Sequence, residues 1–321
     1  MKKNLLLLAA TAMMLVGCQN GQNEAPQEPV TKQQAIKTYF GSPVAFNGTF
    51  VESSNALLRA SKSQPAGAPA ILAEGSSYPA YSWTPQDGTW PIDVTVDYGS
   101  EGVIAADGLQ HKGQMAIHAT ARFEEEGSVL TPTFTDFFVY NNILNAEQTI
   151  KNLGKNASGN LVFDVTVNKG YLGAQKQLIY SERTSREMIA GLLNDGTLDP
   201  VVTNHTYSIT GWMKTASTVD TIPGCEATID NQQPMVIAVG DSYPTAGKLS
   251  LTFDKQMSYS VQGMTANYSA AELEFTGKAN GEYGATVTIE FTVVTVKKTL
   301  QLTFRLDENG IIPESIIPTV Q

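Results

Sequence analysis

Residues 91–98 read PIDVTVDY, in which apolar or aromatic side chains alternate with aspartate and threonine. Successive side chains of a β-strand point to opposite faces. One face therefore carries Ile92, Val94, Val96 and Tyr98, and the other carries Asp93, Thr95 and Asp97. We expect a strand with one face in the core and the other in water.

The same alternation recurs over residues 115–123, 161–168, 248–254, 286–293 and 300–306, with clusters of Gly, Asn and Asp between the segments. Clean alternation favours antiparallel sheets that have one solvated face. We found no helical stripe of comparable length, and expect helix only in short stretches near 31–40 and 51–60. The sequence predicts a mainly β fold, antiparallel and β-sandwich-like.

The composition limits the classes of protein that the chain can belong to. Its 321 residues are 42% hydrophobic and 16% charged, which indicates a globular chain with a sizeable core. The net charge of −10 argues against a nucleic-acid partner, because phosphate binding needs a basic surface.

The N-terminus reads MKKNLLLLAATAMMLVGC, with two lysines before an apolar run and a small residue before Cys18. The run is too short to span a bilayer, and its order is that of a secretory signal. Residues 15–18 (LVGC) resemble a bacterial lipoprotein processing site. We expect a signal peptide over 1–17, lipidation of Cys18, and anchoring in the cell envelope, most simply at the outer membrane. Removal of Lys2 and Lys3 takes the net charge from −10 to −12.

The mature chain divides into three predicted parts. Residues 18–75 are expected to form a lipidated tether and a loop-rich segment, because they are polar and contain Pro and Gly clusters. Residues 76–222 and 223–321 are expected to form two β-sandwich-like domains. Residues 91–99 and 234–240 are similar in pattern and each precedes a further strand, which favours two units with a boundary near 221–224.

Several quoted motifs together resemble a known group of proteins. These are Trp90-Pro91, residues 94–99 (VTVDYG), 107–113 (DGLQHKG), 133–140 (TFTDFFVY), 163–168 (FDVTVN), 209–212 (ITGW) and 223–225 (PGC). With the processing site at Cys18, they are similar to uncharacterised lipoproteins of the Bacteroidetes. The resemblance implies a β-rich envelope protein and carries no catalytic residue.

Reactive side chains do not form a recognisable catalytic or metal-binding pattern. His111, His118 and His205 are too scattered for a zinc motif. Asp93 and Asp97 lie roughly 13 Å apart on one strand face, too far for a glycosidase pair. We therefore expect no enzymatic activity, no cofactor and no metal. Cys225, the remaining thiol of the mature chain, is expected to be a small buried hydrophobic residue.

Four aromatic residues stand close together at the start of the β-rich region: Tyr78, Tyr81, Trp83 and Trp90. On loops, such rings can stack on sugars and form a glycan platform, whereas under a sheet they are core residues. Thr221 lies in an Asp-Thr-Ile sequence that resembles an O-glycosylation site of Bacteroidetes envelope proteins.

Two functions follow from these observations. The first is a lipid-anchored envelope protein without enzymatic activity, which binds a ligand or has a structural or surface-display role. The second is a carbohydrate-binding or carbohydrate-active lipoprotein that uses the aromatic group. The expected partners are the membrane, through Cys18, and a glycan or another envelope protein.

Overall fold

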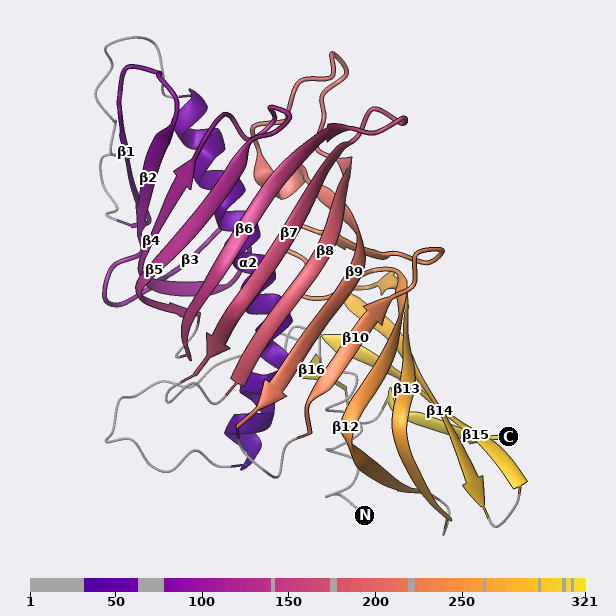
Figure 1. The fold of residues 1–321 in the computed structure, drawn as a ribbon. Coiled ribbons are helices and arrows are strands. Elements are labelled where there is room, and N and C mark those ends of the chain that lie inside the picture. The colour runs from indigo at the N-terminus through magenta and orange to yellow at the C-terminus, as the bar shows by residue number, and fades with distance from the viewer. Residues whose placement is uncertain are drawn as a thin grey trace.

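The computed structural model describes residues 32–62, 78–139, 142–173, 178–218, 223–261, 264–293, 296–307, 310–312 and 315–321. It consists of one long helix, α2 (Lys32–Lys62), and an antiparallel sheet that curves around it (Figure 1). A short 3-10 helix, η3 (Val202–Asn204), precedes the ninth strand.

The strands follow one another along the chain with short connections. They are β1 (Ala80–Thr84), β2 (Ile92–Asp97), β3 (Val103–Ile104), β4 (Gln110–Ala119), β5 (Val129–Val139), β6 (Asn142–Lys155), β7 (Leu161–Leu172), β8 (Leu178–Ala190), β9 (Thr206–Ser217), β10 (Cys225–Ile229), β11 (Met235–Ala238), β12 (Gly247–Val261), β13 (Met264–Ala279), β14 (Glu282–Val293), β15 (Val296–Asp307), β16 (Gly310–Ile311) and β17 (Ile317–Val320). The mainly β, antiparallel fold is confirmed.

The alternation that predicted the strands also describes their burial. In β2, Ile92, Val94 and Val96 are fully buried, while Asp93 is exposed. The neighbouring strand β4 buries Met115 and Ile117 on the same face, and its register places Ile117 opposite Val94. The two-residue period therefore identifies the core face of the sheet before any tertiary contact is known.

Most strands pair with their neighbour in sequence, from β4 through to β10, and then from β12 to β15. The short β11 pairs with β9 beyond β10, and β10 also pairs with β12. The ladder thus crosses the predicted boundary at 222/223 without interruption. Residues 76–222 and 223–321 share one sheet, and their origin as two repeated units stays a prediction.

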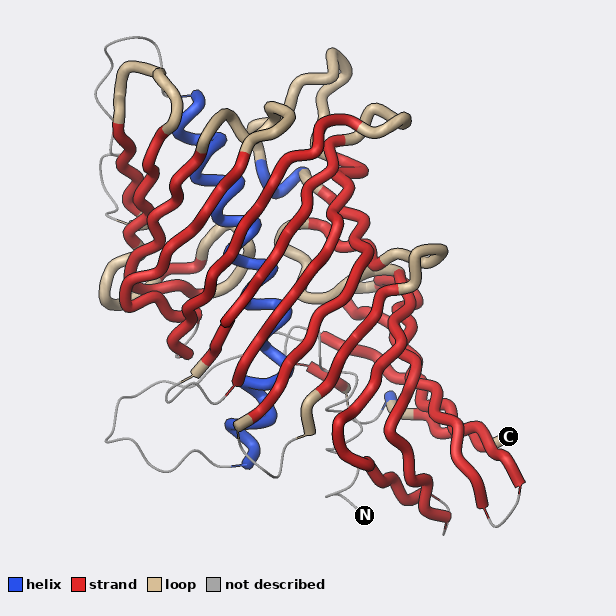
Figure 2. Tube along the Cα trace, in the orientation of Figure 1, coloured by secondary structure: helices blue, strands red, loops and turns tan. Residues whose placement is uncertain are grey.

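Helix α2 runs along one face of the sheet, behind strands β4–β9 in the view of Figure 2. It lies inside the segment 18–75, which we expected to be loop-rich, so this expectation is wrong for residues 32–62. The stretches predicted near 31–40 and 51–60 are joined into one helix that continues through Pro43 and Gly48.

The middle of this helix is buried although it is polar. Thr49, Ser53 and Ser54 are fully buried, and their hydroxyl groups donate hydrogen bonds to carbonyl oxygens of the preceding turn at 2.7–2.8 Å. Such bonds satisfy a hydroxyl group without help from water. Because polar residues occupy buried positions, the helix lacks the apolar stripe by which amphipathic helices are recognised.

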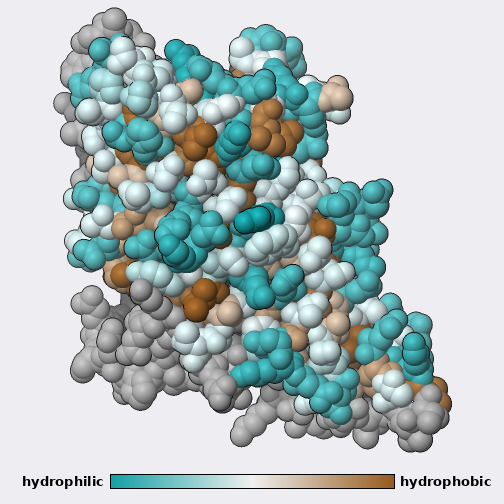
Figure 3. Space-filling view, viewed as in Figure 1, coloured by the Kyte–Doolittle hydropathy of each residue, from teal (hydrophilic) through white to brown (hydrophobic). Residues whose placement is uncertain are grey.

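The sheet surface in Figure 3 is largely polar, with separate apolar patches. Within the described part of the chain, no helix combines the length and the hydropathy that a membrane span requires. The predicted signal peptide over 1–17, the predicted lipidation site Cys18 and the predicted glycosylation site Thr221 lie outside the described residues.

Candidate functional site

A pocket of about 260 Å³ lies between α2, β8, β9, β11 and two turns of the chain. Its apolar walls include Val51 of the helix, Ile209 and Met213 of β9, and Met235 and Ile237 of β11. Its polar lining is Asn47, Asp107, Glu182, Arg186, Asp241 and Ser242. This mixture of apolar walls and a few convergent polar groups is typical of small-molecule sites.

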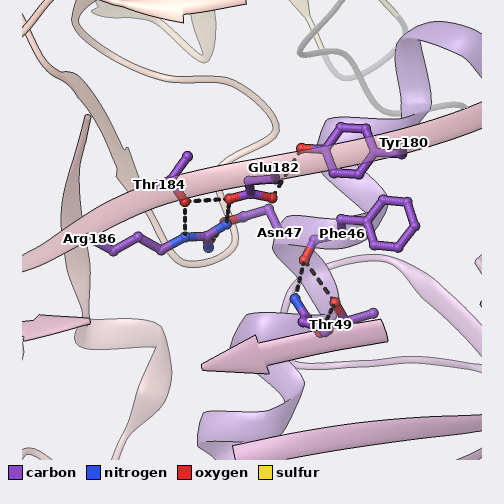
Figure 4. Close-up of polar contacts among 8 residues, drawn as sticks. Phe46, Asn47, Thr49, Tyr180, Glu182, Thr184 and Arg186 are labelled. Atoms are coloured by element: carbon purple, nitrogen blue, oxygen red, sulfur yellow. Dashed lines mark hydrogen bonds and ion pairs between the residues drawn. The ribbon is translucent and has the colours of Figure 1, made fainter. Parts of the chain in front are cut away.

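One wall of the pocket is a polar stripe on β8. Tyr180, Glu182, Thr184 and Arg186 are two residues apart, so all four side chains lie on the inner face of the sheet. Glu182 Oε1 accepts a hydrogen bond from Arg186 Nη2 at 2.8 Å and another from the Thr184 hydroxyl group, as Figure 4 shows. Tyr180 donates to Oε2 at 3.0 Å. Burial raises the pKa of Tyr180 well above its usual value, so this phenol remains a donor.

The stripe is joined to the helix by direct contacts. Arg186 Nη1 donates to Asn47 Oδ1 at 2.6 Å, and the guanidinium carbon lies 4.4 Å from the ring centroid of Phe50. Phe46 stacks on Tyr180 with ring centroids 4.5 Å apart. Glu182 and Arg186 are only 2% and 3% exposed, so the ion pair is held in place before any ligand arrives.

A second buried polar cluster supports the opposite wall. Asp107 lines the pocket, and its Oδ2 lies 2.8 Å from His111 Nε2. Behind it, Glu52 of the helix accepts hydrogen bonds from the Tyr98 hydroxyl group at 2.9 Å and from the Asp107 backbone N–H at 3.2 Å. A Cβ atom at Gly48 would overlap the Asp107 carboxylate, so a larger residue at this helix position would have to displace that side chain.

Burial governs the protonation of this cluster. It raises the pKa of Glu52 to about 7, and the charge of Asp107 adds to the effect while His111 opposes it. For His111, burial alone would lower the pKa, but the carboxylates of Asp107 and Glu52 outweigh it and raise the pKa. The helix is thus fixed to the turn at Asp107 through Glu52, a carboxyl group whose pKa is raised to about 7.

Two glycine-aspartate turns meet at the pocket. A Cβ atom at Gly108 would lie 3.8 Å from the Gly240 carbonyl oxygen, so Asp107-Gly108 and Gly240-Asp241 are neighbours. Asp241 Oδ1 accepts hydrogen bonds from Lys278 Nζ at 2.6 Å and from the Tyr283 hydroxyl group at 2.9 Å. Each turn therefore presents a carboxylate to the pocket and is held by a partner outside it.

The four predicted platform residues lie away from this pocket and do not form an open surface together. Trp83 is 8% exposed and belongs to the core, so its ring face is not available for stacking on a sugar. Trp90 is half-buried against the core. Tyr81 accepts a hydrogen bond from Asn55 at 3.1 Å, whereas Tyr78 is 44% exposed. The burial of Trp83 favours a structural role for this residue, and the glycan platform stays a prediction.

Cys225 is free and buried, as expected, and burial raises the pKa of its thiol. Among the described residues, no group of three or more His, Cys, Asp or Glu side chains is arranged to hold a metal ion.

Sequence reasoning missed Glu182, Arg186 and Glu52. A signal was present in residues 180–187 (YSERTSRE), where polar residues occupy both faces of a strand. A strand that is polar on both faces and lies between buried neighbours has to place polar side chains inside. Comparison of the chain with family models, with curated proteins and with solved structures finds no match.

Proposed function

We propose that this chain is a binding protein that holds a small molecule in the pocket between α2, β8, β9 and β11. The observation that carries the proposal is the Glu182–Arg186 ion pair in the pocket wall, which is 2.8 Å long and almost fully buried. Buried ion pairs are costly to desolvate, and apolar replacements are often as stable or more stable. Stability alone therefore gives no reason for this pair, whereas a fixed polar wall beside a ligand does.

The pocket is also built in advance. Met213 and Met235 provide flexible, polarisable walls, and the stacked Phe46 and Tyr180 rings hold the helix against β8. A preformed site avoids the cost of ordering side chains when a ligand binds. These features support binding rather than a purely structural role for the helix.

For the location, we propose that Cys18 carries a lipid and that the protein is anchored in the cell envelope, as a member of the Bacteroidetes lipoprotein group that its sequence resembles. The support is the order of the N-terminal residues, in which basic, apolar and small residues precede the cysteine. The carbohydrate alternative receives less support, because Trp83 is buried.

Methionine-methyl NMR of the full-length protein tests the binding proposal. We would screen a fragment library that contains cationic, anionic and neutral compounds, and follow the methyl signals of Met213 and Met235. Met115 is fully buried in the core and does not line the pocket, so it is the internal control. We expect hits that move the two pocket signals and leave Met115 unchanged.

The matched variant is Ile237→Trp, which places a large ring in the pocket and should abolish these shifts. Circular dichroism would establish that this variant is folded. If no fragment moves Met213 or Met235 at millimolar concentration, the binding proposal is wrong.

A further inference from the structure

We infer that the ligand of this pocket is a compact, neutral and mainly apolar molecule that carries a hydrogen-bond acceptor such as a carbonyl oxygen. This inference rests on the proposed binding function and names the chemical class that the site accepts. Three observations carry it: the charges of the lining are paired within the protein, the walls are largely apolar, and Arg186 orients the side-chain amide of Asn47.

The charged side chains that line the pocket all have oppositely charged partners in the protein. The pairs are Glu182–Arg186 at 2.8 Å, Asp107–His111 at 2.8 Å and Asp241–Lys278 at 2.6 Å. A charged ligand would lose its hydration in the pocket and would find its counter-ions already paired. Because an unpaired buried charge is costly, the lining favours a neutral ligand.

Arg186 is poorly placed to bind an anion. Its Nη1 donates to Asn47 at 2.6 Å, its Nη2 donates to Glu182 at 2.8 Å, and its Nε donates to the Thr184 hydroxyl group at 3.4 Å. One face of the guanidinium lies against the Phe50 ring, 4.4 Å from its centroid. All three guanidinium nitrogens therefore have protein acceptors, which a ligand carboxylate or phosphate would have to displace.

The contact with Arg186 also fixes the orientation of the Asn47 side chain. A guanidinium group only donates hydrogen bonds, so the amide has to present its oxygen to Arg186 (Figure 4). The amide nitrogen then lies on the other side of the group. Within the described part of the chain this side chain is hydrogen-bonded through Oδ1, and Nδ2 keeps its two donor hydrogens. Because Asn47 lines the pocket, this NH₂ group can donate to a ligand acceptor.

The apolar walls favour a hydrocarbon body over a sugar. The side chains of Val51, Ile209, Met213 and Ile237 offer no hydrogen-bond donors, and a polyol would lose the hydration of its hydroxyl groups on this side. An apolar cavity of about 150 Å³ is large enough for benzene. The pocket volume of about 260 Å³ therefore has room for one ring with a short substituent.

Methionine-methyl NMR titrations of the full-length wild-type protein test the charge class. Three probes share a benzene ring, namely acetophenone, benzoate and 1-phenylethylammonium, and methyl β-glucopyranoside represents a sugar. We expect acetophenone to move the Met213 and Met235 signals and to leave Met115 unchanged. The two charged probes and the glucoside should bind at least about tenfold more weakly, because each would bury charged or polar groups that the pocket does not pair.

Asn47→Asp tests the hydrogen-bond acceptor of the ligand. The aspartate keeps an oxygen for Arg186 and replaces the amide NH₂ group by a second oxygen, which repels a ligand carbonyl group. The matched probe is α-methylstyrene, in which a CH₂ group replaces the carbonyl oxygen of acetophenone. We expect the variant to weaken acetophenone binding by about tenfold and to change α-methylstyrene binding by less than about twofold.

Asn231→Asp is the matched control, because it adds the same charge at an exposed position outside the lining and should change neither affinity. The comparison of charged and neutral probes uses the wild-type protein, so it decides the charge class whether or not Asn47→Asp folds.

Equal or tighter binding of benzoate, 1-phenylethylammonium or the glucoside would overturn the inferred class and leave the binding function intact. Equal effects of Asn47→Asp on acetophenone and α-methylstyrene would overturn the assignment of an acceptor opposite Asn47. Library fragments that move the Met213 and Met235 signals while acetophenone does not would also overturn the class. If neither the probes nor any fragment moves these signals, the binding function itself fails.

Discussion

Asp107 and His111 form an ion pair of 2.8 Å whose two side chains are 4% and 0% exposed. The two residues are four positions apart in the sequence, and β4 begins between them. Glu52 of α2 accepts a hydrogen bond from the Asp107 backbone N–H. One wall of the pocket is thus attached to the helix through Glu52, whose pKa is raised to about 7, and it contains His111, whose pKa is also raised, so this cluster should make the stability of the protein depend on pH.

Wild-type stability should fall as the pH rises from about 5 to 8. The pKa of Glu52 is raised from 4.5 to about 7 by burial, so between these values the folded state binds more protons than the unfolded state. The raised pKa of His111 acts in the same direction, since its stabilising charge is lost as the pH rises through the folded pKa. Glu52→Gln should reduce this loss by on the order of 3 kcal/mol. Urea unfolding at several pH values measures the free energy of unfolding of both proteins. Identical pH profiles for wild type and Glu52→Gln would contradict the prediction.

Breaking the Glu182–Arg186 pair should be severe. Arg186→Met leaves Glu182 buried without its charge partner, which costs about 3–5 kcal/mol. Adding Glu182→Gln to Arg186→Met removes the uncompensated charge and should recover part of this loss. Denaturant unfolding of the single and double variants tests the relationship. A single variant within about 1 kcal/mol of wild type would show that the pair is not held as described.

Gly48→Ala should destabilise the protein, although alanine is normally the better helix former by about 1 kcal/mol. The added Cβ would overlap the Asp107 carboxylate, and overpacking of this kind costs about 1–3 kcal/mol. In an Asp107→Ala background the clash is gone, so Gly48→Ala should become neutral or stabilising. The double-mutant cycle is the measurement, and additive effects of the two changes would argue against the contact.

Trp83→Ala should cost about 3–5 kcal/mol of stability, because Trp83 is a core residue. Tyr78→Ala should cost far less, since Tyr78 is 44% exposed. A glycan platform predicts a different order, in which Trp83→Ala remains stable and loses glycan binding. Thermal unfolding combined with a glycan array separates the two interpretations.

Cys18→Ser should release the protein from membranes, because it removes the thiol that would carry the lipid. Cell fractionation with immunoblotting measures the distribution. Cys225→Ser provides the matched cysteine control and should stay in the membrane fraction if it folds. Retention of Cys18→Ser in the lipid fraction would refute the proposed anchor.

The strands could be predicted from the sequence because the alternation of apolar and polar residues within each strand indicates which side chains are buried. In β2, and in β4 from Met115 onward, every second residue is apolar, and this is sufficient to place Val94 and Ile117 in the core. The helix could not be predicted in full, because its buried positions include the polar residues Thr49 and Ser53. Glycine has a low helix propensity, so Gly48 argued against a continuous helix. In the structure, Gly48 lies inside the helix and packs directly against the Asp107 side chain.

The pocket was beyond sequence analysis for a related reason. Asp107-Gly108 and Gly240-Asp241 are visible as turns, but their proximity depends on how far the sheet curves. Glu182 and Arg186 lie on a strand with polar residues on both faces, so alternation cannot say which face points inward. Tertiary contacts decide both questions.

The hydrogen bond from Arg186 to Asn47 joins residues 139 positions apart, and the polar contact between Thr49 and Gln148 spans 99 positions. The helix therefore forms its native contacts with strands that lie much later in the sequence. A fold rich in such long-range contacts is expected to form slowly. If the chain is exported from its N-terminus, the helix emerges first with its serine, threonine and glutamate side chains still hydrated. It acquires most of its surroundings only after β8 and β9 have crossed, and the pocket is complete only when β11 and the turn at 239–244 have followed.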